Sequence, residues 1–198
     1  MTRLINTIGS YLNPDVLQGL SQKIGADQSA VQSAVGAAIP LLINALGRNA
    51  ADDQGAEEIT SALREDHSGS LLDNLMGFIQ GNALGRDADG PGILEHILGS
   101  RRSAVEKGVS RTSGLDFGQV AQLLTILGPV VMGALGKQRQ ENGLDANGVQ
   151  QLLQNEREET TSQLNGLERL IDRDNDGKIG DDLFGIGTRI LGGIFSRN

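Results

Sequence analysis

Apolar residues recur at intervals of three and four along most of the chain, which is the spacing of one face of an α-helix. The first such stripe holds Leu4, Ile5, Ile8, Tyr11 and Leu12. Further stripes lie within residues 31–46, 59–63, 75–79, 93–98, 120–135, 149–153, 164–171 and 184–195. No segment alternates convincingly with the period of two that is typical of a strand. The pattern predicts an all-α, multihelical fold.

Part of this pattern occurs twice. Residues 16–47 align without gaps with residues 105–136, at an offset of 89, and ten of the 32 positions are identical. The identical positions include Gly25/Gly114, Asp27/Asp116, Pro40/Pro129 and Gly47/Gly136. Matched glycine, aspartate and proline residues at fixed spacing indicate an internal duplication of one helical unit.

The matched residues also predict helix ends. Gly25 and Gly114 suit the left-handed conformation that follows a helix, and Asp27 and Asp116 suit the cap of the next one. The two prolines should kink the long helix or split it in two, and Gly47 and Gly136 should end it. Elsewhere, Asn13, Pro91 and Asp145 are expected to start helices, and residues 70–73 resemble a capping box.

These signals divide the chain into four parts. Residues 1–80 form a first helical repeat unit, 81–92 a Gly/Asp-rich linker and 93–163 a second repeat unit. Residues 164–198 form an EF-hand-like helix–loop–helix. Helices separated by the linker could still pack into one body.

The C-terminal loop carries the clearest chemical signal. Asp172, Asp174 and Asp176 stand at loop positions 1, 3 and 5, and Gly177 follows at position 6. Calcium prefers six to eight hard oxygen ligands, and this spacing places three carboxylates on one turn. The backbone carbonyl of Lys178 would add a fourth protein ligand. We therefore expect Ca²⁺ to bind here.

One position departs from the EF-hand pattern. Position 12 normally holds a glutamate that binds calcium through both oxygens, whereas this chain has Leu183. Asp181 and Asp182 could replace that ligand if the following helix starts early. Asp is shorter than Glu, so the affinity should be weaker. The alternative is an Asp-rich capped turn without a metal.

Composition and charge exclude several functions. The chain has no cysteine, which removes disulfides, thiol nucleophiles and zinc–thiolate sites. The net charge is −8, and residues 51–100 hold ten acidic and two basic residues. Acidity repels nucleic acid and anionic membranes. With no secretory signal recognised and no stretch judged long enough to span a bilayer, we expect a cytoplasmic protein without a transmembrane segment.

Three weaker signals compete with this interpretation. The hairpins around Gly25 and Gly114 resemble a helix-turn-helix, but the helix that would read DNA, residues 27–35, has no Lys or Arg. A basic face formed by Arg101, Arg102, Lys107 and Arg111 is more simply a solvated surface. His67 and His96 lack a recognisable nucleophile, and the apolar segment 183–195 is more simply a docking helix than a membrane anchor.

The segments ILEHILGS and VEKGVSRTSGLDFGQVAQLLTILGPVVMGALG, followed later by DRDNDGKIGDDLFGIG, resemble the DUF937, or YidB-like, family of bacterial proteins. The resemblance covers most of the chain from Leu17 onward. It implies a multihelical fold with internal repeats, and an Asp pair at loop positions 10 and 11. It implies no established enzymatic activity.

Together these observations predict a non-enzymatic helical interaction or scaffold protein with a calcium-binding loop. Its ligands would be Asp172, Asp174, Asp176, Lys178, Asp181 and Asp182. A protein partner or self-association is expected, nucleic acid is not, and no small-molecule substrate is identified. A helix-turn-helix protein associated with DNA is the alternative.

Overall fold

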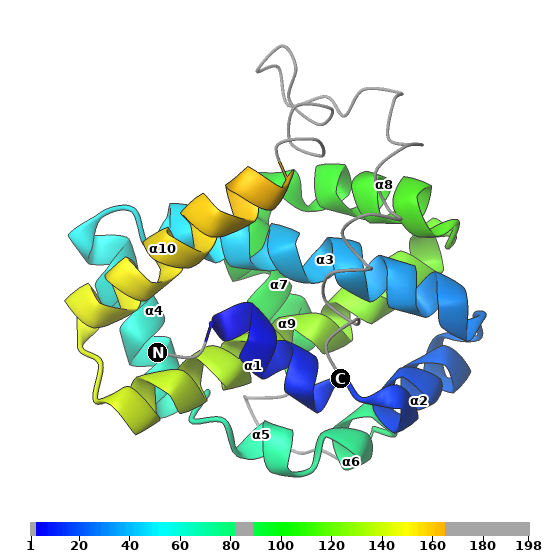
Figure 1. Ribbon diagram of the computed structural model, residues 1–198, viewed down its shortest axis with the longest axis horizontal. Coiled ribbons are helices and arrows are strands. Elements are labelled where there is room, and N and C mark those ends of the chain that lie inside the picture. The colour runs from blue at the N-terminus through cyan, green and yellow to red at the C-terminus, as the bar shows by residue number, and fades with distance from the viewer. Residues whose placement is uncertain (1–2, 82–88, 165–198) are drawn as a thin grey trace.

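The structure is a computed structural model that describes residues 3–81 and 89–164. Within these ranges every regular element is a helix, which confirms the all-α prediction. The α-helices, shown in Figure 1, are α1 (Leu4–Tyr11), α2 (Pro14–Ile24), α3 (Gln28–Asn49), α4 (Asp53–Glu65), α5 (Ser70–Asp73), α6 (Leu75–Ile79), α7 (Gly90–Leu98), α8 (Arg102–Ser113), α9 (Phe117–Asn142) and α10 (Ala146–Leu164). A 3₁₀ turn, Gly99–Arg101, joins α7 to α8.

Most of the expected helix boundaries are present. The Asn13 side chain accepts a hydrogen bond from the Val16 N–H at 3.0 Å, and Pro14 opens α2. Gly25 and Gly114 follow α2 and α8 with φ of 66° and 76°, the left-handed region that favours glycine. Asp89 and Asp145 cap α7 and α10 through the amides of residues 92 and 148.

The two matched aspartates differ in how they cap. Asp116 accepts a hydrogen bond from the Gln119 N–H at 2.8 Å, while the Gln119 side chain accepts one from the Asp116 N–H at 3.1 Å. This is a complete capping box. Asp27 occupies the cap position of α3 with extended backbone, but its side chain makes no capping hydrogen bond. The expected cap is therefore confirmed only at Asp116.

Other boundary predictions are wrong. Both long helices run through their prolines, Pro40 and Pro129, so the predicted split is wrong, whereas its alternative, a kink, stays a prediction. They also pass beyond Gly47 and Gly136, which therefore do not stop them. The predicted capping box at residues 70–73 is absent because Gly69, with φ of 100°, precedes α5 and Ser70 already lies inside it.

The two glycines that were expected to end α3 and α9 lie instead at close contacts between helices. A Cβ on Gly136 would lie 1.7 Å from the backbone oxygen of His67, at the end of α4. A Cβ on Gly47 would lie 3.0 Å from the backbone oxygen of Leu153 in α10. Because glycine has no side chain, these helices approach each other more closely than they could with any other residue at these two positions.

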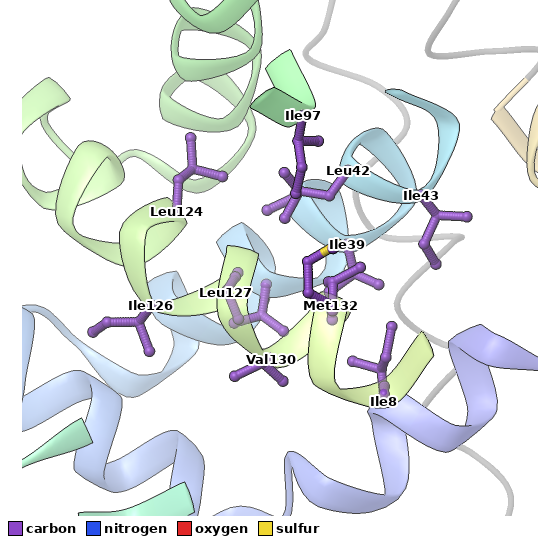
Figure 2. Close-up of a cluster of buried hydrophobic side chains, with 14 of the residues drawn as sticks. Ile8, Ile39, Leu42, Ile43, Ile97, Leu124, Ile126, Leu127, Val130 and Met132 are labelled. Atoms are coloured by element: carbon purple, nitrogen blue, oxygen red, sulfur yellow. The ribbon is translucent and has the colours of Figure 1, made fainter. Parts of the chain in front are cut away.

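Helices α3 and α9 form the centre of the core (Figure 1). They pack against each other, and α1, α4 and α7 each pack against α9. Figure 2 shows branched aliphatic side chains from α1, α3, α7 and α9 meeting in this region, including Ile8, Leu42, Ile97 and Leu127. Each of these four side chains is buried, and none is aromatic.

The expectation that no stretch suits a membrane span needs correction. Gln28–Asn49 and Phe117–Asn142 are long and apolar enough to cross a membrane, judged by length and composition. In the structure, 78% and 72% of their most apolar windows are buried inside the protein. A central core helix passes the same test as a membrane helix, so the finding is weak evidence for a membrane location.

Helix α10 is fastened to the start of the chain. The Glu156 carboxylate accepts a hydrogen bond from the Leu4 N–H at 2.8 Å, in the first turn of α1. Arg3 forms a 2.6 Å ion pair with Glu159 one turn later. The first-turn amides of a helix have no partner within that helix, so Glu156 supplies one from a residue 152 positions away.

Glu156 is only 6% exposed. Burial of the carboxylate raises the pKa of Glu156, whereas the Leu4 N–H and the charge of Arg3 act in the opposite direction. The net shift is upward, so the folded protein binds a proton at Glu156 more readily than the unfolded chain does.

We expect Gly136→Ala to destabilise the protein, because the new methyl group would overlap the His67 carbonyl and force α9 away from the end of α4. Overpacking of this kind costs about 1–3 kcal/mol. Gly9→Ala is the matched control, since a Cβ at Gly9 meets nothing within 4 Å. It should be neutral or stabilising by up to about 1 kcal/mol through helix propensity. Urea unfolding measures both, and equal stabilities would contradict the close contact.

Glu156→Gln keeps an acceptor for the Leu4 N–H and removes the buried charge. A raised pKa in the folded state means that Glu156 adds stability as the pH falls toward its unfolded value of 4.5, and loses that stability as the pH rises. The stability of wild type relative to Glu156→Gln should therefore increase between pH 7.5 and pH 5. Glu158→Gln, at an exposed position on the same helix, should show a smaller change. Urea titrations at the two pH values measure the difference.

Candidate functional site

The six predicted calcium ligands, Asp172, Asp174, Asp176, Lys178, Asp181 and Asp182, lie outside the described residues. So does the apolar segment of residues 183–195. The calcium site therefore stays a prediction. The described element that precedes it is α10, whose buried face holds Val149, Leu152 and Leu153.

Within the described ranges, a cleft of about 680 Å³ opens between the C-terminal end of α3, the helix α4 and the helix α7. Its apolar lining comes from Leu46, Ile59, Ala62, Ile93, Ile97 and Met132. Its polar lining includes four carboxylates, those of Asp52, Glu58, Asp66 and Asp89. No Lys or Arg is among the described residues that line it, so its charge is strongly negative.

Both histidines of the chain line this cleft, which the sequence did not predict. His67 is 7% exposed and follows the last turn of α4, whereas His96 is exposed on α7. His96 Nδ1 lies 3.1 Å from the Gly92 carbonyl oxygen, one turn earlier on its own helix. The two residues lie 29 positions apart in sequence, so only the packing of α7 beside α3 and α4 reveals that they share a site.

The described residues contain no group of three or more His, Asp or Glu side chains close enough to hold a metal ion. Among the described residues that line the cleft there is no Ser, Thr or Cys that either histidine could activate. The carboxylates line the cleft together with apolar side chains, most of which are buried. This arrangement suits a ligand that is both positively charged and apolar better than it suits a metal ion.

Asn49 fixes one wall of the cleft. Its Nδ2 donates hydrogen bonds to the carbonyl oxygens of His96 and Ile97, at 2.9 and 3.1 Å. These carbonyls lie in the last turn of α7, where they have no partner within the helix. Asn49 therefore joins the end of α3 to the end of α7 and holds two lining helices together.

Some acidic residues that the sequence alone would assign to solvated helix faces make specific hydrogen bonds or ion pairs in the structure. Glu58 lines the cleft and accepts a hydrogen bond from the Gln54 side chain at 2.9 Å, whereas its neighbour Glu57 lies 3.8 Å from Arg64. Asp52 caps α4 by accepting the Gly55 N–H at 2.8 Å. The acidity of residues 51–100 is the signal that could have pointed to this cleft.

The surfaces of the helix-turn-helix-like hairpins and of the basic stretch add little support for DNA binding. The first turns of α3 and α9, which a helix-turn-helix would present to DNA, expose Gln28, Ser29 and Phe117 but no Lys or Arg. In the basic stretch, the Arg102 side chain donates to Glu106 at 2.8 Å, so one of its four charges is offset within α8. DNA association stays an alternative prediction.

A second, smaller hollow of about 510 Å³ lies between α2 and α6. Its lining contains one acid, Asp15, and one base, Lys23, with Gln18, Gln22 and Gln80. Met76 and Ile79 provide the apolar part, and Met76 lies against Gly19. The opposing charges give this hollow no preference for one sign of ligand.

The described residues form a helical body centred on two long helices, with an acidic and partly apolar cleft beside them. The chain belongs to the family described as "Bacterial protein of unknown function (DUF937)", whose model matches residues 6–138. The predicted family membership is thereby confirmed, and the match ends before the Asp-rich loop of residues 172–182. No match to this chain was found among curated proteins or among solved structures.

We expect Asn49→Ala to loosen the junction of α3 and α7, because two helix-end carbonyls lose their donor. The loss of one or two such bonds should lower the free energy of unfolding by about 1–3 kcal/mol. Asn6→Ala, at an exposed position on α1, is the matched control and should change stability by no more than about 0.5 kcal/mol. Thermal and urea unfolding compare the two variants, and an Asn49→Ala protein as stable as the control would disprove the role of Asn49.

Proposed function

We propose that this chain is a non-enzymatic helical interaction protein in which the loop of residues 172–182 binds calcium. The observation that carries the proposal is the loop sequence, with aspartates at positions 1, 3 and 5 and glycine at position 6. This spacing supplies hard oxygen ligands around one sharp turn, as a calcium loop requires. In the proposed site, Asp172, Asp174, Asp176 and Asp182 provide carboxylates, Lys178 its carbonyl, and Asp181 an alternative ligand.

The attachment of α10 to the body supports a role for such a loop. Asp172 follows the end of α10 at Leu164 by eight residues. Helix α10 is itself held by the buried Glu156–Leu4 hydrogen bond and by the close approach of Gly47. Ordering of the loop by calcium would therefore act on a segment whose preceding helix is already fixed to the core. Calcium could in this way set the position of the residues that follow.

We also propose that the body arose by duplication of one helical unit. Residue pairs related by the offset of 89 support this idea. The Ser21 hydroxyl donates to the Ala26 carbonyl at 2.5 Å, and Ser110, at the equivalent position, donates to Leu115 at 2.6 Å. Gly47 and Gly136, equivalent in the alignment, both lie at close helix contacts.

Contacts between the two units follow the same offset. Asn49 donates to the backbone of His96, and the equivalent residues, Gln138 and Thr7, also meet through a hydrogen bond of 2.8 Å between their side chains. At the level of helices, α1 packs on α9 as α7 packs on α3, and α4 packs on α9 as α10 packs on α3. Each unit thus contributes the same helix to the long helix of the other unit. Such reciprocal contacts are expected if two duplicated units are related by an approximate two-fold axis.

The remaining parts of the proposal rest on sequence. The absence of cysteine is compatible with the cytoplasm, where we place the protein. A protein partner or a second copy is the expected ligand, because the acidic surface disfavours nucleic acid and the described clefts contain no recognisable catalytic set. The two apolar helices are buried core helices in this proposal.

Calorimetric titration of metal-free protein with Ca²⁺ should give saturable binding of one ion per chain. Because Leu183 replaces the bidentate glutamate, we expect a Kd of about 10⁻⁵–10⁻³ M, weaker than that of tight EF-hand sites. Asp174→Ala should abolish the heat and the calcium-dependent rise in Tm. Mg²⁺ should bind more weakly, because it prefers a smaller octahedral site.

Asp15→Asn, on α2 in the body, serves as the matched control and should bind Ca²⁺ as wild type does. If wild type and Asp174→Ala have the same Tm with and without calcium, the loop is a capped turn and the calcium part of the proposal is wrong.

A further inference from the structure

The acidic cleft between α3, α4 and α7 is lined by residues with a clear chemical preference. Asp52, Glu58, Asp66 and Asp89 surround an apolar floor, and the described lining contains no cation. Three of the four acids, Asp52, Glu58 and Asp89, are exposed and accessible to a ligand. A ligand that fills the cleft should therefore have branched apolar side chains for the floor and arginine or lysine near them for the rim.

The other half of the molecule provides an internal comparison, which rests on the duplication proposed above. The offset of 89 relates His67 of the cleft to Glu156, Asn49 to Gln138, and Gly92 to Arg3. At this equivalent place the surface is closed by the start of α1. The Leu4 N–H donates to Glu156, and the Arg3 side chain forms its ion pair with Glu159. An arginine followed by apolar residues thus covers the acidic surface of the second half.

Basic and apolar residues without any acidic residue between them also occur in residues 183–198. This segment contains Arg189 and Arg197, no acidic residue, and two of the four phenylalanines of the chain. Its branched residues Leu183, Ile186, Ile190 and Ile194 recur at intervals of three and four, as on one face of a helix. Its charge and its apolar side are both complementary to the cleft.

The chain between the body and this segment is long enough. Nineteen positions separate Leu164 at the end of α10 from Leu183. An extended chain of that length spans about 60 Å, whereas α9, the longest helix described, is about 39 Å long. Helix α10 packs directly against α3 and α4, two of the helices that form the cleft. An extended connection of this length would reach the cleft from the end of α10.

We propose that residues 183–198 of the same chain dock in the acidic cleft between α3, α4 and α7, with Ile186, Ile190 and Ile194 on its apolar floor and Arg189 at its acidic rim. The occupant of the cleft in this proposal is a segment of the same chain, and its basic and apolar residues match the charge and the apolar lining of the cleft. The proposal does not depend on calcium binding by residues 172–182. A second copy of the chain and a different protein are the competing occupants.

The absence of native cysteine allows a direct test with the full-length chain. Ser196→Cys is combined with Gln54→Cys, at the lining of the cleft, and the pair is treated with a short flexible bismaleimide in EGTA and in Ca²⁺. The matched control combines Ser196→Cys with Ser29→Cys, an exposed position near the start of α3. Ser29 is 20 positions from Asn49 on the same helix, about 30 Å along its axis.

Docking predicts crosslinked monomer that forms about tenfold faster in the cleft pair than in the control pair, because docking raises the effective concentration at one place only. Arg189→Glu or Glu58→Lys alone should slow the cleft reaction toward the control rate, and the two changes together should restore it. Circular dichroism and Tm confirm that each variant is folded.

Three results would overturn the proposal. Equal rates for the cleft and control pairs under both conditions would mean that the segment has no preferred place. Covalent dimer as the product of the cleft pair, at rates that depend on protein concentration, would assign the cleft to a second copy. A preference for the cleft that survives both single charge reversals would show that charge complementarity does not guide the contact.

Discussion

The close approach of helices at glycine is the constraint on which the rest of the structure depends. The core has few aromatic side chains, and branched and small aliphatic residues must fill it (Figure 2). Such side chains fill space only if the helix axes lie near each other. At Gly136, α9 reaches the end of α4 with no room for a methyl group, and Gly47 brings α3 to α10. The positions of α4 and α10, and with them one wall of the cleft, follow from these two contacts.

The helices themselves could largely be predicted from the sequence, because their apolar residues keep a period near 3.6 over long runs. The chain turns after α2 and α8 could also be predicted, since Gly25 and Gly114 need the left-handed conformation that their sequence context suggests. The packing roles of Gly47 and Gly136 could not be predicted in this way. A glycine near the end of an apolar run is compatible both with a helix end and with a close contact between helices. Only the position of a neighbouring helix distinguishes these two roles.

The prolines and the aspartate caps show a similar limit. Pro40 and Pro129 lie in buried helices whose packing on several sides compensates for the lost backbone hydrogen bond, so the helices continue. Asp27 and Asp116 stand at equivalent positions, but only Asp116 has a glutamine three residues later that completes the capping box. That Gln119 also donates to the Gly25 carbonyl at 3.0 Å, which links the second hairpin to the end of the first. Tertiary contacts of this kind cannot be read from the local sequence.

The cleft was the least predictable feature, because its residues come from α3, α4, α7 and α9 and the segments beside them, and none belongs to a recognisable motif. What the sequence does contain is the asymmetry between the two halves. In the proposed duplication, the two units would have begun with the same surface, and later divergence would have decided which copy is covered. In one half Arg3 stands where the other has Gly92, and Glu156 stands where the other has His67. In the half with Arg3 and Glu156, the Arg3 side chain forms an ion pair with Glu159, and Glu156 accepts a hydrogen bond from the Leu4 N–H. The half with Gly92 and His67 has the accessible cleft. The four carboxylates, with no Lys or Arg among the described lining residues, give the cleft a negative potential that attracts cations. In the proposed docking, the arginines of residues 183–198 would meet this charge while the apolar side chains of the segment contact the apolar lining.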